Sequence, residues 1–157
     1  MNLTESFWQR FLKSKELPKE TKYFEAFHFE LTKKVANDLL KLVLEGKKKA
    51  TASSLEAYRK ENEKLPIPGD YSIVTDFDGT PYGVIRTTAV TILPYRFMTY
   101  DICKREGEDD SLESWQNNHK KFFTEEGKEI GYKFTENMLV VFEDFELLFQ
   151  EEYHEEN

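Results

Sequence analysis

The strongest constraint on the fold comes from three segments whose residues favour β-strands. Residues 82–93 are rich in Val, Ile and Thr, and residues 71–75 and 139–149 have a similar β-branched and aromatic content. Asp78-Gly79 lies between the first two of these segments in the chain and predicts a tight connection. The sequence therefore predicts long strands joined by short turns.

Three further segments carry apolar residues at helical spacing after a capping residue. The expected helices begin after Thr4 or Ser6, after Thr32, and after Asp110 or Ser111. The second helix runs to about Glu45 and ends at Gly46, a residue typical of helix C-termini. The apolar faces are expected to hold three sets of residues: Phe7, Trp8, Phe11 and Leu12; Val35, Leu39, Leu42 and Val43; and Leu112, Trp115, His119 and Phe122.

Strands interrupted by helices and joined by turns indicate an α+β fold, with a small curved sheet or barrel and helices on its rim. The 157 residues suit a single domain, since 39% are hydrophobic and 33% are charged. The sequence shows no apolar stretch long enough to span a bilayer and no signal-peptide pattern at its start. The single cysteine, Cys103, cannot form an internal disulfide, and no Cys/His cluster has zinc spacing. We therefore expect a cytoplasmic protein with no membrane partner, no metal and no other cofactor.

The formal net charge of −8 is unevenly distributed. The acidic C-terminal end, residues 143–157, holds seven acids and no Lys or Arg, and the rest of the chain has 23 acids and 22 bases. A nearly neutral body can bind a phosphate-bearing ligand through a local basic cluster. It lacks the basic stripe typical of proteins that bind long nucleic acids. The acidic end is expected to be a solvated segment that favours solubility.

The local basic cluster is the run Lys47-Lys48-Lys49, which follows the expected end of the second helix. Cations there complement the helix dipole, and this is the expected role of Lys47 and Lys49 if the run is only structural. An inward-facing lysine, with Lys48 the candidate, could instead grip an anion together with the hydroxyl of Thr51 or Ser53. A desolvated Lys48 could also act as a base toward Thr51. All five residues are therefore candidates for the site.

An acidic segment, residues 106–111, holds four acids in five positions. Its spacing is not that of an EF-hand loop, so we expect Asp109 and Asp110 to cap the third helix rather than to bind a metal. Glu106 precedes Gly107, a residue that permits close backbone approach. Glu106 is thus the candidate to face a pocket, hold a lysine or shuttle a proton.

Four aromatic or cationic side chains have two interpretations. Trp115 and His119 share one helix face, where core packing is the default, but at the rim of a cleft they could stack a base and donate a hydrogen bond. Tyr95 and Arg96 follow Pro94 in a loop, and the same two interpretations apply to them. These four residues complete the set of candidate ligand-binding residues.

Several segments, taken in order, resemble the ASCH domain family. Residues 46–51 are similar to its G-x-K-x-x-T signature, and Leu65-Pro66-x-Pro68-Gly69-Asp70 is similar to its entry into the barrel. Residues 105–119, which read Arg-Glu-Gly-Glu-x-Asp-Ser-Leu-x-x-Trp-x-x-x-His, are similar to a segment of bacterial members, and Phe122-Phe123 follow it. The resemblance covers about residues 23–149 and identifies residues 1–157 as a single ASCH domain.

The resemblance implies a PUA-like β-barrel with helices packed around it, a cleft at its rim and an association with RNA. Some members are thought to bind RNA, some to cleave it, and some small ones to hydrolyse the acetyl amide of N4-acetylcytidine. In those small amidohydrolases a Lys, a Thr and a Glu carry the chemistry, and by motif these roles fall on Lys48, Thr51 and Glu106. The chain departs from them at Ser53, where they have an Arg, and by extra residues between Thr51 and Pro66.

The leading hypothesis is a rim cleft that binds RNA or a modified nucleoside through Lys48, Thr51 and Glu106, with the four aromatic and cationic candidates as a second layer. A second hypothesis is an amidohydrolase for an N4-acylated cytidine-type substrate. In it, a neutral Lys48 takes the proton of Thr51, the Thr51 oxygen attacks the amide carbonyl, and Glu106 returns a proton to the leaving amine. A ribonuclease is a third hypothesis, and an RNA-binding module without chemistry is a fourth.

Overall fold

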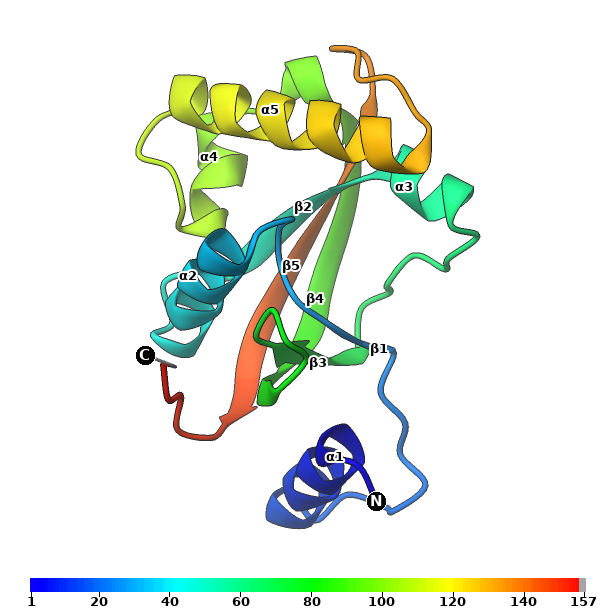
Figure 1. Ribbon diagram of the computed structural model, residues 1–157, viewed down its shortest axis with the longest axis vertical. Helices are drawn as coiled ribbons and strands as arrows, with labels where there is room; N and C mark the ends of the chain where they lie inside the picture. The colour runs from blue at the N-terminus through cyan, green and yellow to red at the C-terminus, as the bar shows by residue number, and fades with distance from the viewer. Residues whose placement is uncertain (156–157) are drawn as a thin grey trace.

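The computed structural model describes residues 1–155, so Glu156 and Asn157 of the acidic end lie outside the described part. Five strands form one sheet in the order β1-β3-β4-β5-β2, and helices pack around it (Figure 1). The strands are β1 (Glu25–Phe27), β2 (Ala50–Ser54), β3 (Tyr71–Thr75), β4 (Pro81–Pro94) and β5 (Leu139–Gln150). The helices are α1 (Leu3–Ser14), α2 (Lys33–Leu44), α3 (Leu55–Lys60), α4 (Tyr100–Cys103) and α5 (Leu112–Ile130), with 3-10 turns η1 (Tyr95–Phe97) and η2 (Lys104–Glu106).

The sheet follows the predicted strands and is strongly curled. The predicted residues 71–75 form β3, and residues 82–93 and 139–149 fall within β4 and β5. Antiparallel pairing joins β3 to β4, β4 to β5 and β5 to β2, while β1 runs parallel to β3. Register shifts interrupt the β3–β4 and β4–β5 pairs, and such irregularities bend a sheet. The edge strands β1 and β2 consequently line one common cavity, and the predicted α+β class with a barrel-like sheet is confirmed.

Helix α1 covers the end of the sheet that lies farthest from α5 (Figure 1). It begins earlier than predicted because Asn2, rather than Thr4 or Ser6, is its N-cap: the Asn2 Oδ1 accepts a hydrogen bond of 2.8 Å from the Glu5 amide. Its predicted apolar face is confirmed, since all four residues are at most 2% exposed. They pack against the Ile73 side of β3 and against β4.

Helix α5 lies across the top of the sheet and α2 lies at its left in the view of Figure 1. Helix α2 begins after Thr32 as predicted, but its buried face is rotated: Val35 is 39% exposed and Leu42 is half-buried. Ala36 and Leu40 are buried instead, together with Leu39 and Val43, because this face packs on β3, β4 and β5. Helix α5 begins after Ser111, whose hydroxyl accepts from the Ser114 amide, so Ser111 rather than Asp110 is the cap. Within the described residues no helix is both long enough and apolar enough to cross a membrane.

The acidic end is solvated only in part over its described residues: Glu152 and Glu155 are exposed, but the acids before them are not free in solvent. Glu143 belongs to β5 and is 7% exposed. Asp144 pairs with Arg105 at 2.7 Å, and Glu151 pairs with Arg10 at 2.6 Å. These three acids therefore take part in the sheet and in its contacts with neighbouring segments, which corrects the expectation for this part of the acidic end.

Candidate functional site

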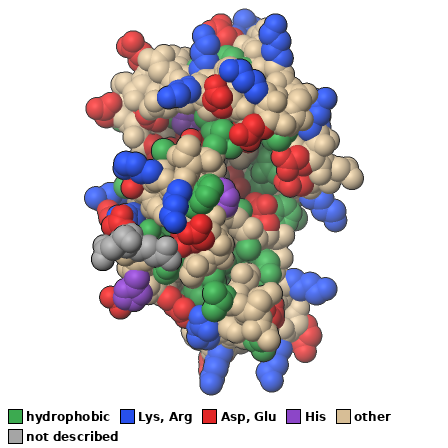
Figure 2. Space-filling view, viewed as in Figure 1, with side chains coloured by type: hydrophobic (Ala, Val, Ile, Leu, Met, Phe, Trp, Pro, Cys, Tyr) green, Lys and Arg blue, Asp and Glu red, His purple; other side chains and the backbone are tan. Residues whose placement is uncertain are grey.

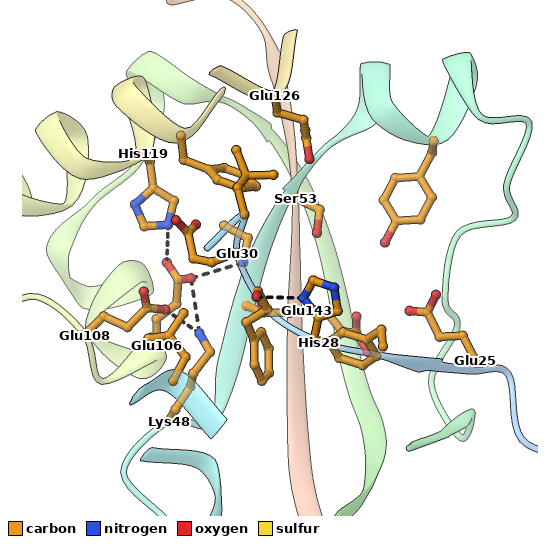
Figure 3. Close-up of a pocket in the computed structure, with 18 residues that line it drawn as sticks. Glu25, His28, Glu30, Lys48, Ser53, Glu106, Glu108, His119, Glu126 and Glu143 are labelled. Carbon is orange, nitrogen blue, oxygen red and sulfur yellow. Dashed lines mark hydrogen bonds and ion pairs between the residues drawn. The ribbon is translucent and has the colours of Figure 1, made fainter. Parts of the chain in front are cut away.

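A cavity of about 190 Å³ opens between β1, β2, the segment before α2, the η2 turn and α5. Figure 3 shows its lining side chains. Lys48, Glu106, Glu108 and His119 gather at one end, and Glu25 lies at the other. Leu39 of α2, Tyr58 of α3 and Glu143 of β5 line it as well, so the cavity combines side chains from many separate segments, which is typical of a ligand site rather than of a packing defect.

Two loops meet backbone to backbone and place Lys48 in the cavity wall. After α2, Gly46 adopts a left-handed φ of 78°, and the Lys48 amide donates to the Leu42 carbonyl at 3.0 Å. Gly107, with a φ of 70°, lies so close to this turn that an added Cβ would be 2.1 Å from the Lys47 carbonyl oxygen. Only glycine fits both constraints at position 107. The contact sets Glu106 and Glu108 on two sides of the Lys48 side chain.

The Lys48 side chain is buried and fully bonded. It is 2% exposed, and its Nζ donates to the Ala50 carbonyl at 2.7 Å and to the Glu108 carboxylate. Glu106 Oε1 lies 3.6 Å from the same nitrogen, and the ring of Phe29 lies 5.1 Å away. An ammonium held in this way has no lone pair with which to accept a proton. Lys48 is therefore the shared cationic partner of the Glu106 and Glu108 carboxylates.

Glu106 is the most completely bonded carboxylate of the site. Its Oε1 accepts from the Ala52 amide at 3.1 Å, and its Oε2 accepts from the indole of Trp115 and lies 3.4 Å from His119 Nε2. Burial alone would raise the pKa of Glu106, but the charges of His119 and Lys48 and the hydrogen bonds outweigh it and lower the pKa to about 2. Glu106 is therefore a fixed negative charge.

His119 is held between two hydrogen-bond acceptors. Its Nδ1 lies 2.9 Å from the Trp115 carbonyl oxygen and its Nε2 faces Glu106, so both nitrogens serve as donors only in the imidazolium form. Burial would lower the pKa of His119, but the charge and hydrogen bond of Glu106 raise it above its ordinary value. The imidazole also stacks on Trp115, with ring centroids 4.2 Å apart. His119 thus contributes a second positive charge.

The hydroxyl candidates lie on the inner face of β2. The alternate residues Ala50, Ala52 and Ser54 of this strand are buried. Thr51 and Ser53 lie between them on the other face, where they line the cavity. The structure therefore brings Lys48, Thr51 and Ser53 to one cavity with Glu106 and His119. Their catalytic and ligand-binding roles remain predictions.

The other candidates lie outside the cavity. Lys47 and Lys49 are exposed, and Lys47 pairs with Glu45 at 3.0 Å. Tyr95 is buried and donates from its hydroxyl to the Gln116 carbonyl at 2.5 Å. Arg96 is exposed and covers the neighbouring Phe97 ring at 4.7 Å. Trp115 is entirely buried behind Glu106, where it positions that carboxylate.

Several lining residues carry no signal in the sequence that marks them for the site. Glu108 comes two residues after Glu106, and only the reversal of the chain at Gly107 shows that both face Lys48. Five more acids or polar residues line the cavity at distant points of the chain: Glu25, Glu30, Tyr58, Glu126 and Glu143. His28 also lines it. Strand alternation in β5 could have suggested Glu143, but no sequence signal joins it to the rest.

The cavity wall is rich in carboxylates that favour the protonated form. Burial, with the charges of Glu143 and Glu63, raises the pKa of Glu25 to about 7. Burial also raises the pKa of Glu143, although the Thr87 hydroxyl donates to it at 2.7 Å. The wall therefore offers both donors and acceptors to a ligand, and little net positive charge.

Three of these side chains have the spacing of a metal cluster. One ligand atom each of Glu106, Glu108 and His119 lies within 4.8 Å of the other two. The Lys48 ammonium already pairs with both carboxylates, and both nitrogens of His119 face oxygen acceptors. We therefore interpret the cluster as an ion-pair network whose cations are side chains.

Known proteins resemble this chain over nearly its whole length. The sequence profile described as the ASCH domain matches residues 25–149. A crystal structure of protein EF3133 from Enterococcus faecalis V583 has a TM-score of 0.83 and 36% identity, over 92% of this chain and 86% of that one. The crystal structure of an ASCH domain from Lactobacillus crispatus JV V101 has a TM-score of 0.83 and 34% identity, over 94% of this chain and 95% of that one. No protein of the curated set matched the chain.

The matched region contains the elements that build the cavity. It begins at Glu25 on β1, includes the turn that carries Lys48, and ends within β5 after Glu143. The match therefore covers far more than half of the chain, and it covers the candidate site as well as the sheet. The chain belongs to the ASCH domain family.

Proposed function

We propose that this protein binds a nucleoside-sized molecule in the cavity at the Lys48 end of the curled sheet. The observation that carries the proposal is the convergence of Lys48, Thr51 and Glu106 on one cavity of about 190 Å³. That volume corresponds to the liquid volume of roughly six water molecules. It suits a single base or small nucleoside and excludes a duplex. The PUA-like fold of the family supports a ligand that comes from RNA.

The charge of the wall favours the base and sugar over the phosphate. Among the described residues that line the cavity, six are glutamates and Lys48 is the one Lys or Arg, whose ammonium is already paired. A phosphate would face these carboxylates without a free cation. On the face drawn in Figure 2, lysines and arginines are interspersed with acids and form no continuous stripe. We therefore expect a neutral nucleoside, or a single base extruded from RNA, to bind better than a nucleotide.

A second candidate function, hydrolysis of an N4-acylated cytidine, is favoured by Thr51. Its side chain points into the cavity that also contains the Lys48 ammonium. A hydroxyl becomes a nucleophile when a neighbouring base takes its proton. Lys48 can do so only after it has passed one of its own protons to another group. A ribonuclease gains no comparable support, because the wall disfavours a phosphodiester.

Binding and turnover can be measured with one set of ligands. Calorimetry should give a lower Kd for cytidine or N4-acetylcytidine than for cytidine 5′-monophosphate, with little dependence on salt. Tighter binding of the monophosphate, or binding only to RNA and only at low salt, would contradict the nucleoside proposal.

Two threonine variants separate hydrolysis from binding. Thr51→Ala should bind N4-acetylcytidine within a few-fold of the unmodified protein but should not release cytidine from it. Thr88→Ala is the matched control, because Thr88 lies on the long strand β4 and is exposed. Equal turnover by Thr51→Ala and Thr88→Ala would reject Thr51 as the nucleophile.

A further inference from the structure

The end of the cavity that lies opposite Lys48 holds a carboxyl group with open acceptors. Glu25 lines this end from β1, as Figure 3 shows. Among the described residues, the structure gives the Glu25 carboxyl no hydrogen-bond donor, and the charges that act on it are those of two other acids, Glu143 and Glu63. The oxygens of Glu25 are therefore available to a ligand.

Glu143 on β5 presents a second open oxygen from a deeper position. It is 7% exposed, and its Oε2 accepts from the Thr87 hydroxyl at 2.7 Å, whereas within the described part of the chain no donor reaches its Oε1. In that part no fully buried side-chain oxygen lacks a partner, so Oε1 is open to the cavity that Glu143 lines. Glu143 also lies opposite Thr51 in the β2–β5 register, which makes their side chains neighbours on the inner face of the sheet.

Two hydroxyl groups complete this end of the cavity. Tyr58 of α3 and Ser53 of β2 line it, and their side chains are hydrogen-bonded to each other. Burial raises the pKa of the Tyr58 phenol, and the charges of Glu143 and Glu25 add to the rise, so the phenol keeps its proton. Lys48, the one Lys or Arg of the described wall, is held at the opposite end. The two carboxyls must therefore take their donors from a ligand.

We propose that this end of the cavity binds the 2′- and 3′-hydroxyls of a ribose, with Glu25 and Glu143 as acceptors and Tyr58 as a donor. The site would then select ribonucleosides over deoxynucleosides. The inference rests on the proposed function, since it takes a nucleoside as the ligand. Adjacent hydroxyls supply two donors, and a carboxylate that accepts from a ribose hydroxyl is how dinucleotide-binding folds recognise this sugar. The 2′-hydroxyl is also the group that distinguishes RNA from DNA.

The chemistry of the base determines which end of the cavity receives the sugar. The amide of an N4-acylated cytosine must reach Thr51 if it is to be hydrolysed, and Thr51 lines the cavity together with Lys48. In a pyrimidine ring C4, which carries N4, and N1, which carries the ribose, lie on opposite sides. The ribose of such a ligand is therefore directed away from Lys48 and toward Glu25 (Figure 3).

Calorimetry with cytidine, 2′-deoxycytidine and 2′,3′-dideoxycytidine tests the inference. Cytidine should bind about 10- to 100-fold more tightly than the dideoxy compound, with 2′-deoxycytidine between them, because each lost hydroxyl leaves an acceptor unpaired. Glu25→Gln and Tyr58→Phe should each reduce this preference to about three-fold or less. Glu20→Gln is the matched control and should keep the full preference, because Glu20 is exposed and lies outside the cavity wall.

The outcomes separate this inference from the proposed function. Equal affinity for the three compounds, or the same preference in Glu25→Gln and Glu20→Gln, overturns the ribose site while nucleoside binding stands. If no nucleoside binds, the proposed function is wrong, and methyl β-D-ribofuranoside, which has the two hydroxyls but no base, decides the inference. A shift of the Glu25 carboxyl carbon-13 NMR signal, identified by its loss in Glu25→Gln, supports the ribose site, and no shift overturns it.

Discussion

Replacing Gly107 tests whether the contact between two loops holds the site together. Alanine at a left-handed φ costs about 1–2 kcal/mol. At Gly107 the new Cβ would also lie 2.1 Å from a backbone oxygen, that of Lys47, which no side-chain rotation can relieve. Overpacking of this kind typically costs a further 1–3 kcal/mol or so. The turn carrying Lys48 must then move away from Glu106 and Glu108.

Gly131→Ala is the matched control, because Gly131 also has a left-handed φ, 94°, but an added Cβ there meets nothing within 4 Å. Urea unfolding should show Gly107→Ala to be less stable than Gly131→Ala by about 1–3 kcal/mol. For a chain of this size, each kcal/mol should lower the Tm by about 2–4 °C. Gly107→Ala should also weaken nucleoside binding, whereas Gly131→Ala should not. Equal stability and equal binding of the two variants would refute the loop contact as the support of the site.

Three further perturbations probe the ion-pair network. Trp115→Phe leaves an oxygen of Glu106 without its indole donor and should lower the free energy of unfolding, measured in urea, by about 1.5–3 kcal/mol. The indole of Trp8 donates to the Thr21 carbonyl, so Trp8→Phe should lower it by about 1 kcal/mol. Lys48→Met leaves Glu108 without its cation and Glu106 with His119 as its one cationic partner among the described residues, and it should cost about 3–5 kcal/mol. Exposed Lys47→Met should cost no more than about 0.5 kcal/mol, and equal costs would contradict the network. The lowered pKa of Glu106 adds stability that is lost as pH falls from 4.5 toward 2, and the raised pKa of His119 adds stability that is lost as pH rises above 6.5. Thermal unfolding should therefore give a higher Tm at pH 5.5 than at pH 3 or pH 8.

Most of the fold could be predicted from local patterns. Residues 71–75 form a strand with the predicted bounds, because a β-branched run bounded by turn residues is typical of a β-strand. The strand β2 was not predicted, because Ala50–Ser54 contains only small residues and derives its conformation from pairing with β5. The predicted cap of α1 is wrong because Asn2, Thr4 and Ser6 are equally good caps in sequence, and the helix begins after the first of the three.

The site is harder to predict because its partners meet through loop packing. Lys48 and Thr51 follow one motif, so their proximity can be inferred from local spacing. In sequence Glu108 is only one acid of a capping run, since nothing local distinguishes it from its neighbour Asp109. The distinction comes from Gly107, whose approach to the lysine turn selects which acids face the ammonium. Such a contact depends on the whole sheet.

The charge of the cavity, rather than the charge of the chain, determines which ligand can bind. In the sequence, the excess of acids lies in the C-terminal end, residues 143–157, and the rest of the chain is nearly neutral with a basic turn at Lys47–Lys49. In the structure Glu143 of that end faces the cavity together with Glu25, and the inward lysine of the basic turn is neutralised by Glu108. Two of the three lysines point to solvent, so the basic turn supplies no free cation to the cavity. A wall of this kind offers hydrogen-bond donors and acceptors rather than a free cation, and for this reason we expect a base to bind to it better than a phosphate.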